Sequence, residues 1–255
     1  MALPLKAEPR INELIKRLSD TTASVYLAYE YGGSDALKEQ RAMRGKPQLV
    51  SIFESPFLGV NGWIKRVEDV VLGSDILIVI AIPMLLIAVT IMLTSKGSVL
   101  FRQRRYCLFG KQFEIFKFRT MTTSDEDDCV QQACKNDPRI TKFGAFLRRT
   151  SLDKLPRFFL VITGVMSIVG PRPHAVAHNE QYRALIQGFM LRHKVKPGIT
   201  GWAQVNGWRG ETGTVEKMRK RVEFDLSYIR NWTFFSDLKI ILMTVFAADT
   251  RKNAR

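Results

Sequence analysis

Three short stretches of the sequence carry side chains that can handle a phosphate group. They are Lys117-Phe-Arg-Thr-Met121, Thr150-Ser-Leu-Asp-Lys-Leu-Pro156 and Gly170-Pro-Arg-Pro-His174. A carboxylate can attack a phosphorus atom and form an acyl phosphate, which splits one difficult transfer into two easier steps. Arginine presents parallel N–H donors that match phosphate oxygens. We therefore interpret the aspartate of the second stretch as a candidate nucleophile in a basic, phosphate-binding site.

Each stretch also has a simpler explanation. Lys117 and Arg119 alternate with a phenylalanine, which is typical of the solvated face of a strand. Ser151 or Asp153 is suited to cap the helix that the following apolar run predicts. Arg172 stands between two prolines, as in a rigid surface turn. The combination of all three stretches with a neighbouring membrane segment favours phosphoryl transfer at a lipid surface.

The membrane segment is the run from Ile76 to Thr94, which contains no charged residue. As a helix it is long enough to reach across the hydrocarbon layer of a bilayer. A buried core helix is the alternative, and apolarity on every face of the run disfavours it. Pro83 lies near the middle, where it bends or breaks a helix.

Basic residues flank this run on both sides, namely Lys65, Arg66, Lys96, Arg102, Arg104 and Arg105. Positive residues tend to stay on the cytoplasmic side of a membrane. We therefore expect both ends of the segment to lie on one face. The prediction is a re-entrant helix over about residues 74–95, with a break that lets the chain enter and return.

Apolar spacing predicts the remaining elements. Residues 10–18 have helical spacing, while Ala23–Tyr29, Leu49–Phe53 and Gln112–Phe118 have the pattern of strands. Residues Phe234–Phe246 suit a helix that packs on the core or lies in the membrane interface. The predicted fold class is α+β, a mainly helical compact domain with a small β-sheet, one re-entrant membrane helix and interfacial amphipathic helices.

Composition bounds the partners. The 255 residues carry a formal net charge of +15, which points to nucleic acid, an acidic membrane surface or phosphorylated substrates. Cys107, Cys129 and Cys134 show no metal-binding or paired spacing, so free thiols are expected. The acidic residues 125–128 are most simply a solvated loop, with metal binding as the alternative. A zinc site on His174 and His178 would need further ligands that the sequence does not supply nearby.

Several motifs together resemble a known family. The stretches KFRTM, DPRITKFGAFLRRTSLD and SIVGPRPH, followed by RHKVKPGITGWAQVNGWRGET, are similar to the monotopic polyprenyl-phosphate phosphoglycosyl transferases. These enzymes initiate capsule, exopolysaccharide and O-antigen synthesis, and the subgroup acting on undecaprenyl phosphate with UDP-glucose or UDP-galactose looks closest. The resemblance runs from about Val50 onward. It implies a transferase domain over residues 61–255, with residues 1–60 resembling the truncated end of an α/β domain of larger members.

The resemblance implies a two-step reaction at the cytoplasmic face of the bacterial inner membrane. Asp153 would attack the β-phosphate of a UDP-sugar and release UMP, and undecaprenyl phosphate would then take the sugar phosphate. A Mg²⁺ ion beside Asp153 would neutralise the diphosphate. The residues matching the family's substrate-binding positions are Lys117, Arg119, Arg139, Arg148 and Arg172. A homo-oligomer is left open, and the motifs do not specify the sugar.

One motif departs from the family pattern. The family has Asp-Glu-Leu-Pro-Gln where this chain has Asp153-Lys-Leu-Pro-Arg157. The Lys154 ammonium would compete with a metal ion for the neighbouring carboxylate. The chain is thus either an active divergent transferase or an impaired relative that still binds nucleotide sugar or polyprenyl phosphate. A basic nucleic-acid-binding membrane protein is the third reading, and no binding motif supports it.

Overall fold

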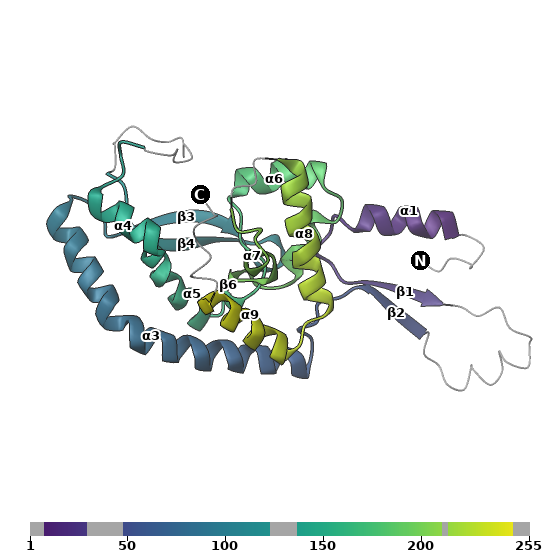
Figure 1. The fold of residues 1–255 in the computed structure, drawn as a ribbon. Helices are drawn as coiled ribbons and strands as arrows, with labels where there is room; N and C mark the ends of the chain where they lie inside the picture. The colour runs from purple at the N-terminus through teal and green to yellow at the C-terminus, as the bar shows by residue number, and fades with distance from the viewer. Residues whose placement is uncertain (1–7, 30–47, 123–136, 211–213, 247–255) are drawn as a thin grey trace, which may run out of the picture.

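The computed structural model describes residues 8–29, 48–122, 137–210 and 214–246. Two-stranded sheets are interspersed with helices along these ranges (Figure 1). The antiparallel pairs are β1 (Val25–Tyr29) with β2 (Gln48–Phe53) and β3 (Leu100–Tyr106) with β4 (Gln112–Phe118), and the parallel pair is β5 (Ser167–Val169) with β6 (Gly198–Thr200). The α+β class is confirmed. The expectation of one small sheet is wrong, because the strands of the described residues form three separate two-stranded sheets.

The helices agree with the sequence pattern where that pattern is amphipathic. The first is α1 (Glu8–Leu18). The last described helix, α9 (Phe234–Phe246), has the predicted bounds. Between them lie α3 (Val60–Thr94), η2 (Leu108–Gly110), α4 (Lys142–Thr150), η3 (Leu152–Arg157), α5 (Phe158–Ile162), α6 (Val176–Leu185), η4 (Phe189–Lys194), α7 (Trp202–Val205) and α8 (Val215–Arg230).

The long helix α3 contains the uncharged run. It has 35 residues and is long and apolar enough to cross a membrane, and only 11% of its most apolar window is buried. That exposure excludes the buried-core alternative. The helix begins at Val60, earlier than expected, because the amphipathic turns before residue 74 continue it. The expected break at Pro83 is not present. A proline removes only one backbone hydrogen bond of a helix. The helix therefore continues past Pro83, and α3 is curved (Figure 1).

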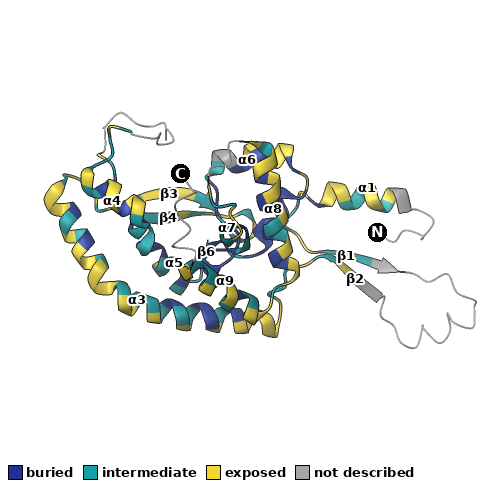
Figure 2. Cartoon of the chain, viewed as in Figure 1, coloured by how far each residue is buried: buried dark blue, intermediate teal, exposed yellow. Residues whose placement is uncertain are grey.

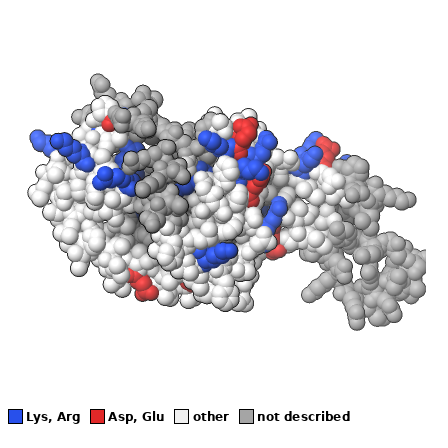
Figure 3. Space-filling model, viewed as in Figure 1, with Lys and Arg blue, Asp and Glu red and all other residues white. Residues whose placement is uncertain are grey.

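An exposed apolar band runs along α3 and α9. In α3 it includes Ile78, Val79 and Ile82, each more than 70% exposed, and in α9 it includes Phe235 and Phe246. Figure 2 shows α3 as largely exposed, and Figure 3 shows few charged side chains along the edge where α3 and α9 run. Such a band is far larger than soluble proteins normally leave in water. It is consistent with a membrane-associated face.

Buried ions hold the first turns of α3 on the domain. The Lys65 Nζ lies 2.6 Å from Asp237 Oδ2 of α9 and 3.3 Å from Asp69 Oδ1. The Tyr228 hydroxyl of α8 donates to Asp237 Oδ1 at 2.9 Å. Asp69 Oδ1 in turn accepts from the Ser167 hydroxyl at the start of β5. One network therefore joins α3, α8, α9 and β5.

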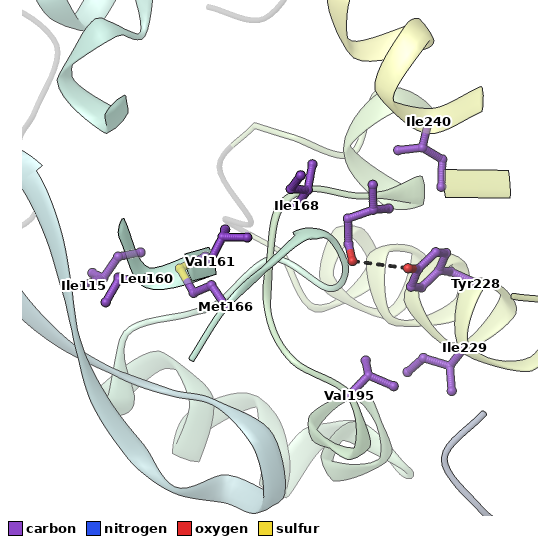
Figure 4. Close-up of a cluster of buried hydrophobic side chains, with 10 residues drawn as sticks. Ile115, Leu160, Val161, Met166, Ile168, Val195, Tyr228, Ile229 and Ile240 are labelled. Atoms are coloured by element: carbon purple, nitrogen blue, oxygen red, sulfur yellow. Dashed lines mark hydrogen bonds between the residues drawn. The ribbon is translucent and has the colours of Figure 1, made fainter. Parts of the chain in front are cut away.

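The main hydrophobic core lies beside this network. Residues from β4, α5, β5, α8, α9 and the segments that precede β5 and follow η4 meet there: Ile115, Leu160, Val161, Met166, Ile168, Val169, Val195, Tyr228, Ile229 and Ile240. Figure 4 shows these side chains, with the dashed line marking the Tyr228 hydroxyl 3.2 Å from the Val169 carbonyl, and this carbonyl shares the one hydroxyl proton with Asp237. Each strand is too short to stand alone, so burial against the helices stabilises it.

The N-terminal elements contact the rest of the chain through Lys194 and Arg183. The Lys194 ammonium donates to the carbonyls of Ala23, before β1, and Phe53, at the end of β2, and Arg183 pairs with Asp20 at 2.8 Å. The predicted helix and both predicted strands of this region are confirmed. Their derivation from a larger α/β domain, and the boundary at residue 60, stay predictions.

Candidate functional site

A sharp turn presents Asp153. Thr141 caps the start of helix α4, because its hydroxyl accepts from the Gly144 N–H at 2.9 Å, and Ser151 caps the end in the left-handed conformation with φ 61°. The chain then forms η3, with Asp153 in its first turn. Neither Ser151 nor Asp153 caps a following helix, because α5 starts after Arg157 without a side-chain cap. The capping explanation is therefore wrong, and Asp153 is left available for chemistry.

Close backbone packing fixes this turn against β4. A Cβ on Gly144 would collide with the carbonyl oxygen of Thr120, so only glycine lets α4 approach the end of β4. Element η3 also packs directly on β4. The strand thereby brings Lys117 to the side of η3 that carries Asp153.

The Asp153 carboxylate is buried among cations. Its residue is 6% exposed, and its Oδ1 accepts no hydrogen bond from the described residues. The Lys154 Nζ lies 3.4 Å from that oxygen. Burial lowers the pKa of Lys117 to about 8 and that of Lys154 to about 8, while the nearby Asp153 charge opposes both shifts. Lys117 is thus no solvated strand residue, and that alternative is wrong.

Arginines extend the positive region outward. Burial lowers the pKa of Arg157 to about 10 and that of Arg172 to about 9, and neighbouring guanidinium charges add to both shifts. The Nε–H groups of Arg105, Arg157 and Arg221 are buried and donate to no acceptor among the described groups. Buried donors without partners are costly. The charges of all three act on Arg172, so they form one positive cluster, which indicates a site for a multiply charged anion.

The parallel pair β5–β6 positions Arg172. This residue follows β5 in the loop Gly170-Pro-Arg-Pro-His174, whose carbonyls are held by other arginines: Arg192 Nη2 donates to the Arg172 carbonyl at 2.6 Å, and Arg105 donates to the Pro173 carbonyl. The loop is therefore part of the site rather than a free surface turn.

The histidine that ends this loop is buried beside a guanidinium group. His174 Nε2 lies 3.5 Å from Arg221 Nη1. Burial, followed by the charges of Arg192 and Arg221, holds the pKa of His174 well below its usual range. His174 lies before α6 begins at Val176, so it does not share a helical face with His178, whose side chain lies outside the described residues.

The other predicted residues fall into two groups. Arg148 lies close enough for its charge to act on Lys117, and its role in substrate binding stays a prediction. Arg119 instead donates to the Ser95 carbonyl and hydroxyl at 2.8 and 2.7 Å, where it fastens the end of α3 to β4. Arg139 forms a two-point ion pair with Asp137. We assign both of these arginines to holding the scaffold beside the site.

The sequence did not single out four of the arginines that line the site. In the sequence, Arg105 belongs to the basic flank of the membrane segment, and Arg157 stands out only as a departure from a family motif. Arg209 and Arg221 come from the loop and helix after β6. Arg221 donates to the Gly210 carbonyl at 2.6 Å and so ties that loop to α8. Within the sequence, only their density near the glycine-rich stretch signals a shared anion site.

The described side chains do not fit a protein-built magnesium site. Among them, no group of three or more His, Cys, Asp and Glu residues is placed to hold a metal ion. The one carboxylate at the centre, Asp153, faces the ammonium of Lys154 rather than a second oxygen ligand. Magnesium prefers oxygen ligands in near-octahedral geometry. The acidic residues 125–128, with Cys129 and Cys134, lie outside the described residues.

Comparison with known proteins agrees with this geometry. Residues 60–251 match the family described as bacterial sugar transferase. A protein of Escherichia coli (strain K12), named UDP-glucose:undecaprenyl-phosphate glucose-1-phosphate transferase, is 55% identical over 96% of this chain and 53% of its own length. A Klebsiella pneumoniae protein of the same name is 53% identical over 100% of this chain and 55% of its own length.

A shorter relative gives the same picture. The Caulobacter vibrioides protein of the same name is 46% identical over 74% of this chain and 71% of its own length. The chain spans about half the length of the first two relatives. The matched region begins where α3 begins and includes every element that builds the anion site. The chain belongs to the bacterial sugar transferase family.

Proposed function

We propose that the protein transfers a hexose 1-phosphate from a UDP-sugar to undecaprenyl phosphate and so initiates a bacterial surface polysaccharide. The observation that carries this proposal is the buried Asp153 carboxylate, with an oxygen that accepts no hydrogen bond from the described residues, among lysines and arginines beside an exposed apolar helix. The relatives named for this transfer from UDP-glucose support it.

The proposed chemistry has two steps. An oxygen of Asp153 forms a bond to the β-phosphorus of the UDP-sugar, and the bond from that phosphorus to the bridging oxygen breaks, so that UMP leaves. A phosphate oxygen of undecaprenyl phosphate then attacks the same phosphorus and releases the carboxylate. Lys117, Lys154 and Arg172 would stabilise charge that develops on the phosphate oxygens in both steps.

We place this chemistry at the cytoplasmic face of the inner membrane. Helix α3 would enter the bilayer and return through the curvature of its continuous helix, and α9 would lie in the interface. The basic residues on both sides of the apolar run support this placement, because they favour one side of the membrane. Asp153 would then lie where a water-soluble nucleotide and a lipid phosphate can both reach it.

Release of UMP tests the proposal. The full chain in nanodiscs is incubated with UDP-glucose or UDP-galactose and undecaprenyl phosphate, alongside Asp153→Asn and Lys217→Glu. Lys217 is exposed on the first turn of α8 and serves as the control. We expect UMP from the parent and the control, and none from Asp153→Asn. Equal release from Asp153→Asn would refute the nucleophile.

The second candidate function is a relative that binds the nucleotide sugar without transferring the sugar phosphate. The 3.4 Å approach of Lys154 to Asp153 favours it, because an ammonium that holds the carboxylate makes it a weaker nucleophile. Binding of UDP-glucose without UMP release from the parent, together with release from Lys154→Glu, would establish this candidate.

A further inference from the structure

The Lys154 ammonium lies beside the central carboxylate of the site, where it affects how the site binds an anion. Its Nζ lies 3.4 Å from Asp153 Oδ1 and 3.4 Å from the Ser151 hydroxyl, and its side chain is 28% exposed. The ammonium therefore sits beside the central carboxylate, partly shielded from water. Asp153 is the acidic residue whose charge acts on Lys117, Lys154 and Arg157 alike.

Positive charge already exceeds negative charge at this place. The charge of Arg157 acts on Lys117, Lys154 and Arg172, and the Asp153 carboxylate offsets the charges of Lys117, Lys154 and Arg157. A diphosphate supplies the missing negative charge and accepts hydrogen bonds from the partnerless Arg157 Nε. A divalent cation would instead add charge of the same sign and would have to displace the Lys154 ammonium from Asp153.

We propose that Lys154 takes the place of a divalent cation at Asp153, so that this site binds the diphosphate of a nucleoside diphosphate without added metal. The inference rests on the proposed function for the identity of the ligand. It departs from the magnesium dependence that the family resemblance implies. It follows from the side chains at the site. The Asp153 carboxylate has the Lys154 ammonium beside it, where the family motif has a second carboxylate that could bind a metal ion.

Replacing this one side chain should restore a need for metal. In Lys154→Glu, two carboxylates stand side by side and one cation is lost, so a diphosphate meets repulsion that only a metal ion relieves. In Lys154→Met, the charge is lost without creating a ligand. Metal should then improve binding less than in Lys154→Glu.

Titration calorimetry with UDP tests the proposal on the full chain in nanodiscs, once with EDTA and once with Mg²⁺. For the parent, and likewise for Lys217→Glu, the dissociation constant for UDP in EDTA should lie within about threefold of its value in Mg²⁺. Lys154→Glu should bind at least about tenfold more weakly in EDTA than in Mg²⁺. Lys154→Met should bind more weakly than the parent in EDTA. Thermal unfolding of each variant verifies that it is folded.

The outcomes separate this inference from the function on which it rests. A parent that needs Mg²⁺ for a tenfold or greater gain in UDP affinity overturns the role of Lys154, while UMP release in the same buffer leaves the transfer standing. Metal-independent binding without UMP release supports the role of Lys154 and contradicts the transfer. A parent that binds UDP in neither buffer contradicts both. Should Lys154→Glu fail to fold, the parent and Lys154→Met still decide the question.

Discussion

Replacing Lys65 by methionine should destabilise the whole domain. The Lys65 ammonium serves Asp237 at 2.6 Å and Asp69 at 3.3 Å, and the side chains of both carboxylates are at most 2% exposed. Methionine fills the space but leaves Asp237, Asp69 and the more distant Glu68, 3.8 Å away, buried without their cation. Breaking a buried ion pair by removing one partner costs about 3–5 kcal/mol.

The structure narrows this range. Asp237 keeps hydrogen bonds from the Tyr228 hydroxyl and the Trp232 indole, and Asp69 keeps those from Ser167 and the Ile168 N–H. These donors still stabilise the carboxylates, so we expect a loss of about 4 kcal/mol rather than the upper limit. For a chain of this size that corresponds to a melting temperature lower by roughly 8–16 °C.

Thermal unfolding in nanodiscs, followed by tryptophan fluorescence at pH 7, measures this loss. Glu68→Gln is the matched control: Glu68 is also buried on α3, but its carboxylate lies 3.8 Å from the Lys65 Nζ and receives no hydrogen bond from the described residues. We expect its melting temperature to change by less than about 3 °C. A Lys65→Met protein that melts with the parent, or a Glu68→Gln protein that loses as much, would refute the role assigned to the network.

Three further predictions concern the site and its support. Asp153→Asn should reduce UMP release by at least about 1000-fold while the melting temperature stays within a few degrees of the parent, and residual activity above that level would contradict the nucleophile. Gly198→Ala should lower both stability and activity, because the added Cβ would collide with the backbone of Gly170 and separate β5 from β6; intact activity would show that the pair tolerates a shift. Burial raises the pKa of Asp225 to about 6, so the folded state holds this proton more tightly than the unfolded state and the contribution to stability falls as pH rises from about 4 to 6. The excess stability of the parent over Asp225→Asn in pH-dependent melting should therefore be largest near pH 4 and shrink toward pH 7; an excess that grows would contradict this.

The sequence predicts the elements whose apolar pattern is local. Strand β4 and helix α9 have the expected bounds because alternation and helical spacing record which side chains face the core. The extent of α3 could not be predicted in this way. Its first turns carry Lys65 and Asp69, which read as a polar flank, and only the partners from α9 and β5 make them buried helix residues.

The site shows the same division. Asp153, Lys117 and Arg172 were predicted from short motifs, and the structure brings them into one charged region. The same motifs predict Arg119 and Arg139 in the site. Arg119 instead donates to Ser95, which is distant in sequence, and Arg139 pairs with the nearby Asp137 carboxylate. The arginines after β6 could not be assigned, since their place depends on how the chain folds back over η3.

Transfer of label from UDP-[¹⁴C]glucose to undecaprenyl phosphate tests the central claim most directly. The parent and Asp153→Asn are incubated with both substrates in nanodiscs, and the lipid is extracted into organic solvent. The account predicts labelled lipid with the parent and none with Asp153→Asn. Label that stays in the aqueous phase with the folded parent, or reaches the lipid equally in Asp153→Asn, would contradict it.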